Sequence, residues 1–289
     1  MTGPRGDFNQ WDFIKNFINM FNLVLTVDEE NPTTIVIEPY NDWVDSGTTH
    51  YWDRKLDTQE IVLAPIEGLS KDIRFMHEED ADDWITTAHE NPNLWKYSHL
   101  FESFDEIYDS VEEEVTLPGF SATYCKQHFG TDMYAPQIMN NDGSAHWENN
   151  MRIMYDNGVR TSADGWNGAL EQPQGQNLFY DYLLFTMVDA FPPIPATSLS
   201  YNFGVVNYSG PGGPVLHGLF NEYWAKYMDE LYHKDTRIAT VNMMLTAADI
   251  HKFKFNDIVH LQGKIWRIKL IEYSGETSSV VELITVKDL

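Results

Sequence analysis

Several short groups of residues in this chain partly match motifs that bind metals or carry out catalysis. The run His77-Glu78-Glu79-Asp80 begins like a zinc-protease motif, but Ala81 stands where the second histidine is required. Cys125 and His128 have a spacing that suits a metal, yet no second Cys/His pair follows to complete four ligands. The sequence therefore predicts no catalytic motif, no metal site and no bound cofactor.

Carboxylate chemistry is the alternative that the composition leaves open. The chain has 44 Asp and Glu residues, and a glycoside hydrolase needs only two carboxylates at a fixed separation. Nine Trp and 15 Tyr could stack on sugars, although such residues commonly fill cores and interfaces, which is the interpretation we favour. A glycan hydrolase with paired acids is thus the second hypothesis.

The elements that would position these residues begin with a predicted amphipathic helix over 11–21. Apolar side chains recur there at three- and four-residue spacing, and Asn9 is suited to cap the helix. We expect Trp11, Phe17 and Phe21 to bury this helix against the rest of the chain.

Alternating apolar residues over 23–27 and 35–37 flank a turn-rich loop and predict a β-hairpin. Two more short strands are expected, at 60–65 and 72–76. The acidic stretch near 101–111 is predicted to be partly helical. Residues 130–215, rich in Asn, Gly, Pro and aromatic side chains, are expected to form long loops with a few strands.

Near the end of the chain the pattern predicts a helix followed by four strands. Helical spacing over 219–233 is expected to bury Tyr223, Trp224 and Tyr227. The strand candidates are 238–245, 258–261, 265–271 and 280–286. Consecutive strands with short turns favour an antiparallel sheet or small β-barrel, and we expect Trp266 inside it.

These elements predict a β-rich α+β fold with three segments. A helix-hairpin α+β unit is expected at 1–77, an acidic and loop-rich insertion at 78–215, and a helix with a small antiparallel β-barrel at 216–289.

The charge and composition restrict the classes of partner. Nineteen basic against 44 acidic residues give a net charge of −25, which excludes a fold-wide basic surface for tight nucleic-acid binding. Within 75–125 there are 13 acidic residues and one basic residue. A solvated surface, a calcium site and a channel wall that repels DNA are open interpretations of this stretch.

No run approaches the ~20 apolar residues of a membrane helix, and the single cysteine fits assembly in a reducing cytoplasm.

Three stretches carry a resemblance to a known family. The first runs from Gln10-Trp11-Asp12-Phe13 through Met20-Phe21-Asn22-Leu23 to Ile35-Val36-Ile37-Glu38-Pro39-Tyr40. The second is Arg152-Ile153-Met154-Tyr155-Asp156-Asn157-Gly158-Val159. The third extends from Leu219 to Leu283 and includes Asn221-Glu222-Tyr223-Trp224 and Ile265-Trp266-Arg267-Ile268. Together they resemble tail-hub (baseplate-hub) proteins of tailed bacteriophages from marine and environmental sources.

The resemblance implies a non-catalytic structural protein of the virion. It implies a trimeric or hexameric ring at the tail tip that joins the tail tube to tip or fibre proteins, assembled in the cytoplasm of the bacterial host. Trp11, Phe17, Phe21, Tyr223, Trp224, Tyr227 and Trp266 are then the expected structural or interface residues. A receptor-binding or adaptor module is a third hypothesis.

Overall fold

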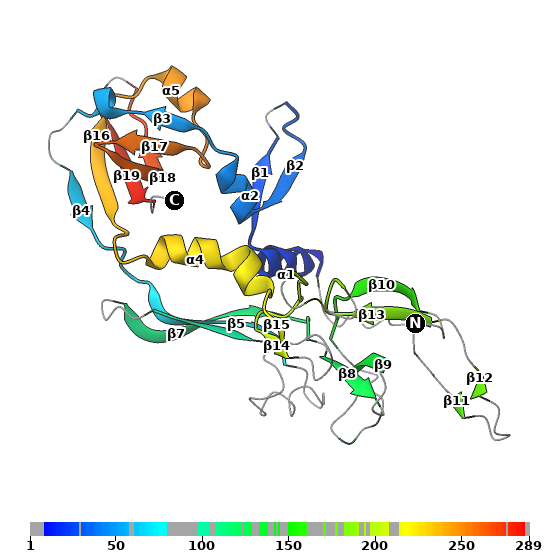
Figure 1. Ribbon diagram of the computed structural model, residues 1–289. Helices are drawn as coiled ribbons and strands as arrows, with labels where there is room; N and C mark the ends of the chain where they lie inside the picture. Colours follow the sequence, from blue (N-terminus) through cyan, green and yellow to red (C-terminus); the bar gives the residue numbers. More distant parts are fainter. Residues whose placement is uncertain are drawn as a thin grey trace. The chain divides into compact units, whose positions relative to one another are not determined.

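The computed structural model of the chain is shown in Figure 1. It describes residues 9–28, 30–57, 61–79, 98–103, 108–122, 124–128, 133–137, 142, 144, 150–160, 170–171, 177–178, 182–190, 194, 197–207, 214–275 and 277–286. The chain divides into two compact units. Unit 1 comprises 1–21, 73–101 and 113–222, and unit 2 comprises 22–72, 102–112 and 223–289.

The described residues form a β-rich α+β fold, as predicted. They contain four α-helices, namely α1 (Gln10–Phe21), α2 (Tyr40–Asp45), α4 (Ala225–Tyr232) and α5 (Ala247–Lys252), and several small sheets. Among the described strands no sheet closes into a barrel, so the small barrel expected at 216–289 is not confirmed.

Unit 2 is built on a six-stranded sheet with the order β3-β17-β18-β19-β16-β4 (Figure 1). The strands are β3 (Thr49–Tyr51), β4 (Val62–Ala64), β16 (Ile238–Met243), β17 (Ile258–Leu261), β18 (Lys264–Glu272) and β19 (Ser279–Thr285). Neighbours are antiparallel except β3, which is parallel to β17. The ends of β16, β17, β18 and β19 lie within two residues of the predicted ends. Alternation of apolar residues is the direct sequence signal of a half-buried strand, so it locates these strands well.

One face of this sheet carries a continuous core. Its side chains come from every second residue of the C-terminal strands and are completed by Trp52 from the segment after β3. The members are Trp52, Ala239, Val241, Met243, Leu245, Val259, Leu261, Trp266, Ile268, Val281 and Leu283. Trp266 is 2% exposed, and its indole N–H donates to the Leu261 carbonyl at 3.1 Å. The predicted interior position of Trp266 is confirmed.

Residues 52–57, which follow β3, contact both sides of the sheet that a barrel would have joined by strand pairing. They include the 3₁₀ turn η1 (Asp53–Lys55). At one end the Trp52 amide donates to the His260 carbonyl of β17 at 3.2 Å. At the other end the Met244 amide donates to the Lys55 carbonyl at 2.7 Å, just after β16. Residues 52–57 therefore contact β17 and the end of β16 on this side of the core without forming a continuous strand ladder between them.

Helix α5 is fixed at its start by a capping box. The Thr246 hydroxyl accepts from the Asp249 amide, and the Asp249 carboxylate accepts from the Thr246 amide at 2.9 Å. Lys55 Nζ lies 2.5 Å from Asp249 Oδ1. Partial burial opposes ionisation, but the bonds from Lys55 and Thr246 lower the pKa of Asp249 to about 2.

Gly47, just before β3, packs directly on the turn that precedes β17. A Cβ atom at this position would lie 1.9 Å from the Asn256 carbonyl oxygen, which belongs to the backbone and cannot rotate away. We expect Gly47→Ala to lower the free energy of unfolding by about 2 kcal/mol through this overpacking. Urea denaturation of the variant and the wild type measures the effect, and equal midpoints would contradict the close approach.

In unit 1, the described part of α1 is capped and packed as its sequence indicates, with one exception. Asn9 Oδ1 accepts from the Asp12 amide at 2.8 Å, which confirms the predicted N-cap. Phe17 and Phe21 are half-buried, and the Phe17 ring lies 5.9 Å from that of Phe120 in an edge-on arrangement. Trp11, however, is 56% exposed, so the expectation that it buries the helix is wrong.

Trp11 lies in the first turn of α1, next to Gln10, while the buried positions of the helix are Asn16 and Met20 in its second half. The Asn16 side chain donates to the Pro118 carbonyl at 2.7 Å. The contact face of α1 is thus set by a polar anchor and a methionine, and only in part by the aromatic residues.

The remaining strands form small sheets. A three-stranded sheet has the order β6-β5-β7 and is followed by four two-stranded pairs: β8–β9, β10–β13, β11–β12 and β14–β15. Their bounds are β5 (Ser70–His77), β6 (His99–Glu102), β7 (Asp109–Leu117), β8 (Tyr124–His128), β9 (Met133–Gln137), β10 (Tyr155–Arg160), β11 (Leu170–Glu171), β12 (Asn177–Leu178), β13 (Tyr182–Thr186), β14 (Val206–Asn207) and β15 (Pro214–Val215).

The prediction of partial helix near 101–111 is wrong where the structure describes it. Residues 101–102 end β6 and residues 109–111 begin β7, and both strands pair with β5. Cross-strand pairing outweighs the helical preference of the acidic run because a strand's stability depends on its neighbours more than on its own composition. Within unit 1, Phe75 of β5 is fully buried, with the rings of Phe203 and Phe220 at 5.9 and 5.1 Å.

Candidate interaction site

The most distinctive surface of unit 2 is a two-stranded hairpin with an exposed apolar face. β1 (Leu23–Val27) pairs antiparallel with β2 (Ile35–Pro39), which confirms the predicted hairpin. Leu25 faces Ile37 and Val27 faces Ile35 on the same side of the ribbon. These four side chains are 36%, 51%, 61% and 62% exposed in that order. We call them the hairpin face.

One hydrogen bond closes the hairpin at its base, and a second joins this base to Tyr223. The Tyr40 amide donates to the Asn22 carbonyl at 2.8 Å, directly below the last cross-strand pair. The Asn22 side chain then donates to the Tyr223 carbonyl at 3.0 Å. Asn22 has a φ of 47°, a left-handed conformation that Asn tolerates better than most residues. The chain therefore turns sharply at Asn22, immediately before β1, and the Asn22 side chain ties this turn to the Tyr223 carbonyl.

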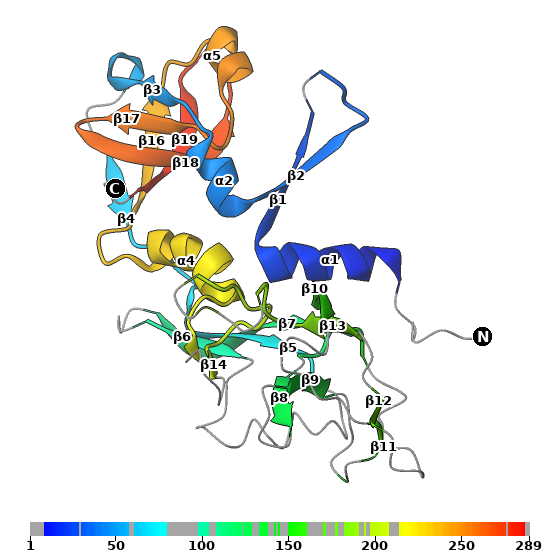
Figure 2. The ribbon, with the colours of Figure 1, turned by 45° about the vertical axis from the view of Figure 1, so that its right-hand side comes forward.

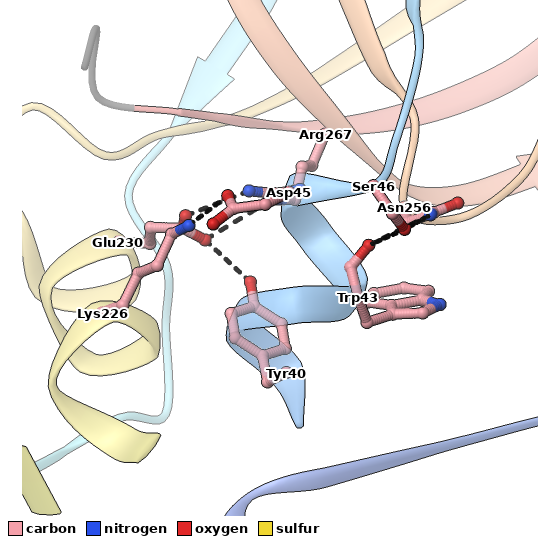
Figure 3. A network of polar contacts seen from close by, with 8 residues as sticks. All are labelled: Tyr40, Trp43, Asp45, Ser46, Lys226, Glu230, Asn256 and Arg267. Atoms are coloured by element: carbon pink, nitrogen blue, oxygen red, sulfur yellow. Dashed lines mark hydrogen bonds and ion pairs between the residues drawn. The ribbon is translucent and has the colours of Figure 1, made fainter. Parts of the chain in front are cut away.

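A partly buried polar network continues from this base and is drawn in Figure 3. The Tyr40 hydroxyl donates to Glu230 Oε2 at 2.7 Å. Arg267 of β18 donates to both oxygens of the same carboxylate, from Nη2 at 3.0 Å and from Nε at 3.3 Å. The Glu230 and Arg267 side chains are 15% and 14% exposed. We call Tyr40, Glu230 and Arg267 the clamp.

The electrostatics of the clamp keep the Tyr40 phenol protonated. Burial and the neighbouring Glu230 carboxylate raise the pKa of the Tyr40 phenol well above its usual range, so Tyr40 remains a donor. A fork-shaped guanidinium that binds a carboxylate through two N–H groups fixes orientation as well as distance. The arrangement is therefore suited to positioning helix α2, and with it the hairpin, against α4 and β18.

The side chains of two further residues hold the second half of α2. Lys226 of α4 forms an ion pair with Asp45. The Asn256 side chain donates to the Trp43 carbonyl and to the Ser46 hydroxyl, each at 3.0 Å (Figure 3). Helix α2 has only six residues and is too short to be stable alone, so these contacts determine its position.

Of the sequence-predicted residues, one contacts the clamp directly and two lie beside it or at the base of the hairpin. Tyr227 packs edge-on against Tyr40 with the ring centres 5.1 Å apart, and Trp224 packs on Tyr227 at 6.1 Å. The Tyr223 carbonyl is the acceptor for Asn22. All three side chains are half-buried, in the helical segment formed by the π-helical turn η3 (Phe220–Trp224) and α4.

The clamp residues themselves were not identified from the sequence. Arg267 interrupts the apolar strand pattern over 265–271, and this interruption was the available signal. A charged residue at such a position usually marks a solvated face, and only the position of Glu230, 37 residues away, shows that it is paired and mostly buried.

A second polar network in unit 2 has residue types that could be taken for a catalytic triad. Asp257 is 2% exposed and accepts from the Thr48 amide at 2.8 Å, the Thr48 hydroxyl at 3.0 Å and the Lys254 amide at 2.9 Å. His50 Nε2 lies 2.8 Å from Asp257 Oδ2 and 3.4 Å from Thr48 Oγ1. In a catalytic triad, one ring nitrogen of the histidine binds the acid and the other binds the nucleophile. Here the same nitrogen, His50 Nε2, contacts both Asp257 and Thr48, so this arrangement is not that of a triad. The network joins β3 to the turn before β17.

Asp257 gives a pH-dependent prediction. Burial alone would raise the pKa of Asp257, but the hydrogen bonds from Thr48, His50 and Lys254 hold it below the usual range. A carboxyl with a lowered folded-state pKa stabilises the fold above its unfolded pKa of about 4, and this stabilisation is lost as the pH falls further. We expect Asp257→Asn to cost about 2 kcal/mol at pH 7 and clearly less at pH 3.

Urea denaturation of both proteins at pH 7 and pH 3 provides the measurement. A difference in unfolding free energy that is equal at the two pH values would contradict the ionised role of Asp257. Because Asn keeps the size of the side chain, a loss of packing is not a competing cause.

The described residues contain no group of three or more His, Cys, Asp or Glu side chains placed to hold a metal ion. His77 is a buried residue of β5, with its ring 5.5 Å from that of Phe203. The side chains of Cys125 and His128 and residues 80–83 of the acidic run lie outside what the structure describes. None of the helices in the described part of the chain combines the length and apolar character required to cross a membrane.

Comparison with known proteins does not extend these observations to a family. No protein-family model matches the chain, and no curated protein has a significantly similar sequence.

Proposed function

We propose that this chain is a non-catalytic structural protein of a bacteriophage tail, which forms a hub ring at the tail tip and joins the tail tube to tip or fibre proteins. The observation that carries the proposal is the hairpin face, an exposed apolar surface whose base is held by the mostly buried clamp. Contiguous exposed apolar side chains on a rigid element are typical of subunits that assemble.

Other exposed apolar side chains in unit 1 support the same interpretation. On α1 they are Trp11, Phe13 and Ile14. On the β10–β13 pair they are Val159, Leu183 and Phe185. The resemblance of both ends of the sequence to tail-hub proteins is the reason for proposing a phage tail as the assembly. In this proposal the open six-stranded sheet of unit 2 takes the place of the small barrel expected at 216–289.

Quantitative mass spectrometry of purified virions tests the proposal. The chain is counted against a portal protein of known copy number, and three or six copies per particle are expected. Absence from the particle would overturn the structural function, and release of reducing sugars from host glycans by the purified chain would then favour the hydrolase alternative. Twelve copies would place the chain at the neck and contradict a tail-tip hub.

A further inference from the structure

One polar face of helix α1 lines a pocket in unit 1. Asp12, Lys15, Asn16 and Asn19 recur at the three- and four-residue spacing of a single helix face, and all four line this pocket. The helix lies beside the ends of β5 and β7 in the same unit (Figure 2). The pocket has a volume of about 610 Å³, within the range of small-molecule sites. We call it the α1 pocket.

The opposite wall of the α1 pocket is built around Glu78, the residue that follows β5. The Gly119 amide donates to the Glu78 carboxylate, the Glu78 amide donates to the Phe120 carbonyl at 3.0 Å, and the Ser121 hydroxyl donates to the Glu78 carbonyl at 2.9 Å. Gly119 has a φ of 74°, a left-handed conformation that glycine adopts without strain. The Glu78 carboxylate is therefore held in position before any ligand binds.

Two side chains of the pocket have unused hydrogen-bonding capacity. Asn16 is 2% exposed, and its Nδ2 donates to the Pro118 carbonyl at 2.7 Å. Because a carbonyl only accepts, the amide nitrogen must face Pro118, and Oδ1 is the acceptor left for the pocket. In the described part of the chain nothing donates to this oxygen, and the hydroxyl of Thr116 on β7 has no partner there either. A nearly buried amide of this kind is normally satisfied by whatever fills the pocket.

The charges of the α1 pocket favour a neutral ligand that carries hydroxyl groups. Lys15 Nζ lies 2.9 Å from Asp12 Oδ1, so these two charges are paired within the helix. A ligand anion would meet Glu78, and a ligand cation would meet Lys15. The unused groups comprise an acceptor on Asn16 and a hydroxyl on Thr116 that both donates and accepts. Sugar hydroxyls complement this set because each of them donates and accepts without a net charge.

A second pocket adjoins the first and extends the site. It has a volume of about 500 Å³ and shares Glu78 and Thr116 with the α1 pocket. Its walls include Arg74 and Met76 of β5 and Glu114 of β7. On β5 these side chains take every second position, opposite those that enter the core. The two pockets together offer room for a ligand longer than one sugar ring.

We propose that the two pockets form a binding site for a neutral oligosaccharide. Asn16 Oδ1 would accept from a sugar hydroxyl in the α1 pocket, while Glu78 and Thr116, which both pockets share, would contact the sugar rings on either side. The site lies in unit 1 and uses none of the hairpin-face or clamp residues. The inference is therefore independent of the proposed function.

The experiment measures binding of four disaccharides to the purified full chain. The probes are cellobiose, maltose, lactose and N,N′-diacetylchitobiose, followed by saturation-transfer difference NMR and isothermal titration calorimetry. Binding of at least one is expected. Thr116→Val removes the hydroxyl at nearly constant shape, and Glu78→Gln keeps an oxygen for the Gly119 amide but removes the charge. Each substitution is expected to weaken binding about fivefold or more through the lost hydrogen bond.

Matched control variants repeat the same substitutions outside the two pockets. Thr240 of β16 and Glu67 are both exposed residues of unit 2. Thr240→Val and Glu67→Gln are expected to leave disaccharide binding unchanged. Circular dichroism spectra that match the wild type show that all four variants are folded.

Three results would overturn the proposal. They are a chain that binds none of the four disaccharides, binding that Thr116→Val and Glu78→Gln leave unchanged, and tighter binding of ethylenediamine than of any disaccharide, which would identify a site for cations. The failure of this site and that of the hub function are distinguishable, because the copy number in virions and disaccharide binding are measured separately.

Discussion

Replacing Trp266 by alanine is expected to lower the free energy of unfolding by about 3–5 kcal/mol. The indole is 2% exposed, at the centre of the core of the six-stranded sheet. The substitution removes the ring contacts, leaves a cavity between strands that are fixed by their pairing, and frees the Leu261 carbonyl from its indole donor. Chemical denaturation monitored by far-ultraviolet circular dichroism gives the loss directly.

Trp11→Ala is the matched control, since it removes the same side chain from a position that is 56% exposed. Its expected effect is within about 0.5 kcal/mol in the isolated chain. A loss below about 1 kcal/mol for Trp266→Ala would contradict the placement of Trp266 in the core. The contrast between the two tryptophans tests burial as the cause, because the residue type is held constant.

Replacing Arg267 by alanine is expected to have the second-largest effect, about 3 kcal/mol. The substitution leaves the Glu230 carboxylate mostly buried without its cation, while Tyr40 still donates to it. Loss of the pair also breaks the link from β18 to Glu230 of α4, which holds Tyr40 at the base of the hairpin, so we expect the hairpin to become more accessible to protease than in the wild type. Denaturant unfolding and limited proteolysis of the full chain measure the two consequences.

The control lies on the same strand. Lys269 pairs with Glu282 at 3.0 Å, but its side chain is 48% exposed, so Lys269→Ala is expected to cost less than about 1 kcal/mol. A double-mutant cycle with Glu230→Gln is expected to show a coupling of at least about 1 kcal/mol between Glu230 and Arg267. Equal losses for the Arg267 and Lys269 variants would contradict the clamp.

Local patterns predicted most of the elements that the structure describes. The strands β16 to β19, the hairpin and helix α1 with its Asn9 cap follow from alternation, helical spacing and capping, all of which are encoded by neighbouring residues. The patterns failed where distant strands decide the outcome. Residues 109–117 form β7 because β5 offers an edge to pair with, and no local signal near 109 reports that edge.

The sequence by itself determined the β-rich α+β class, the apolar side chains of the hairpin, the acidic charge and the position of Trp266 in a strand. Only the tertiary structure decided that Tyr40, Glu230 and Arg267 meet, across separations of 190 and 37 residues. It also decided that the sheet stays open and that Trp11 faces outward. The physical reason is that periodicity records which face of an element avoids water, whereas partners for buried charges and sheet edges are chosen by packing between distant segments.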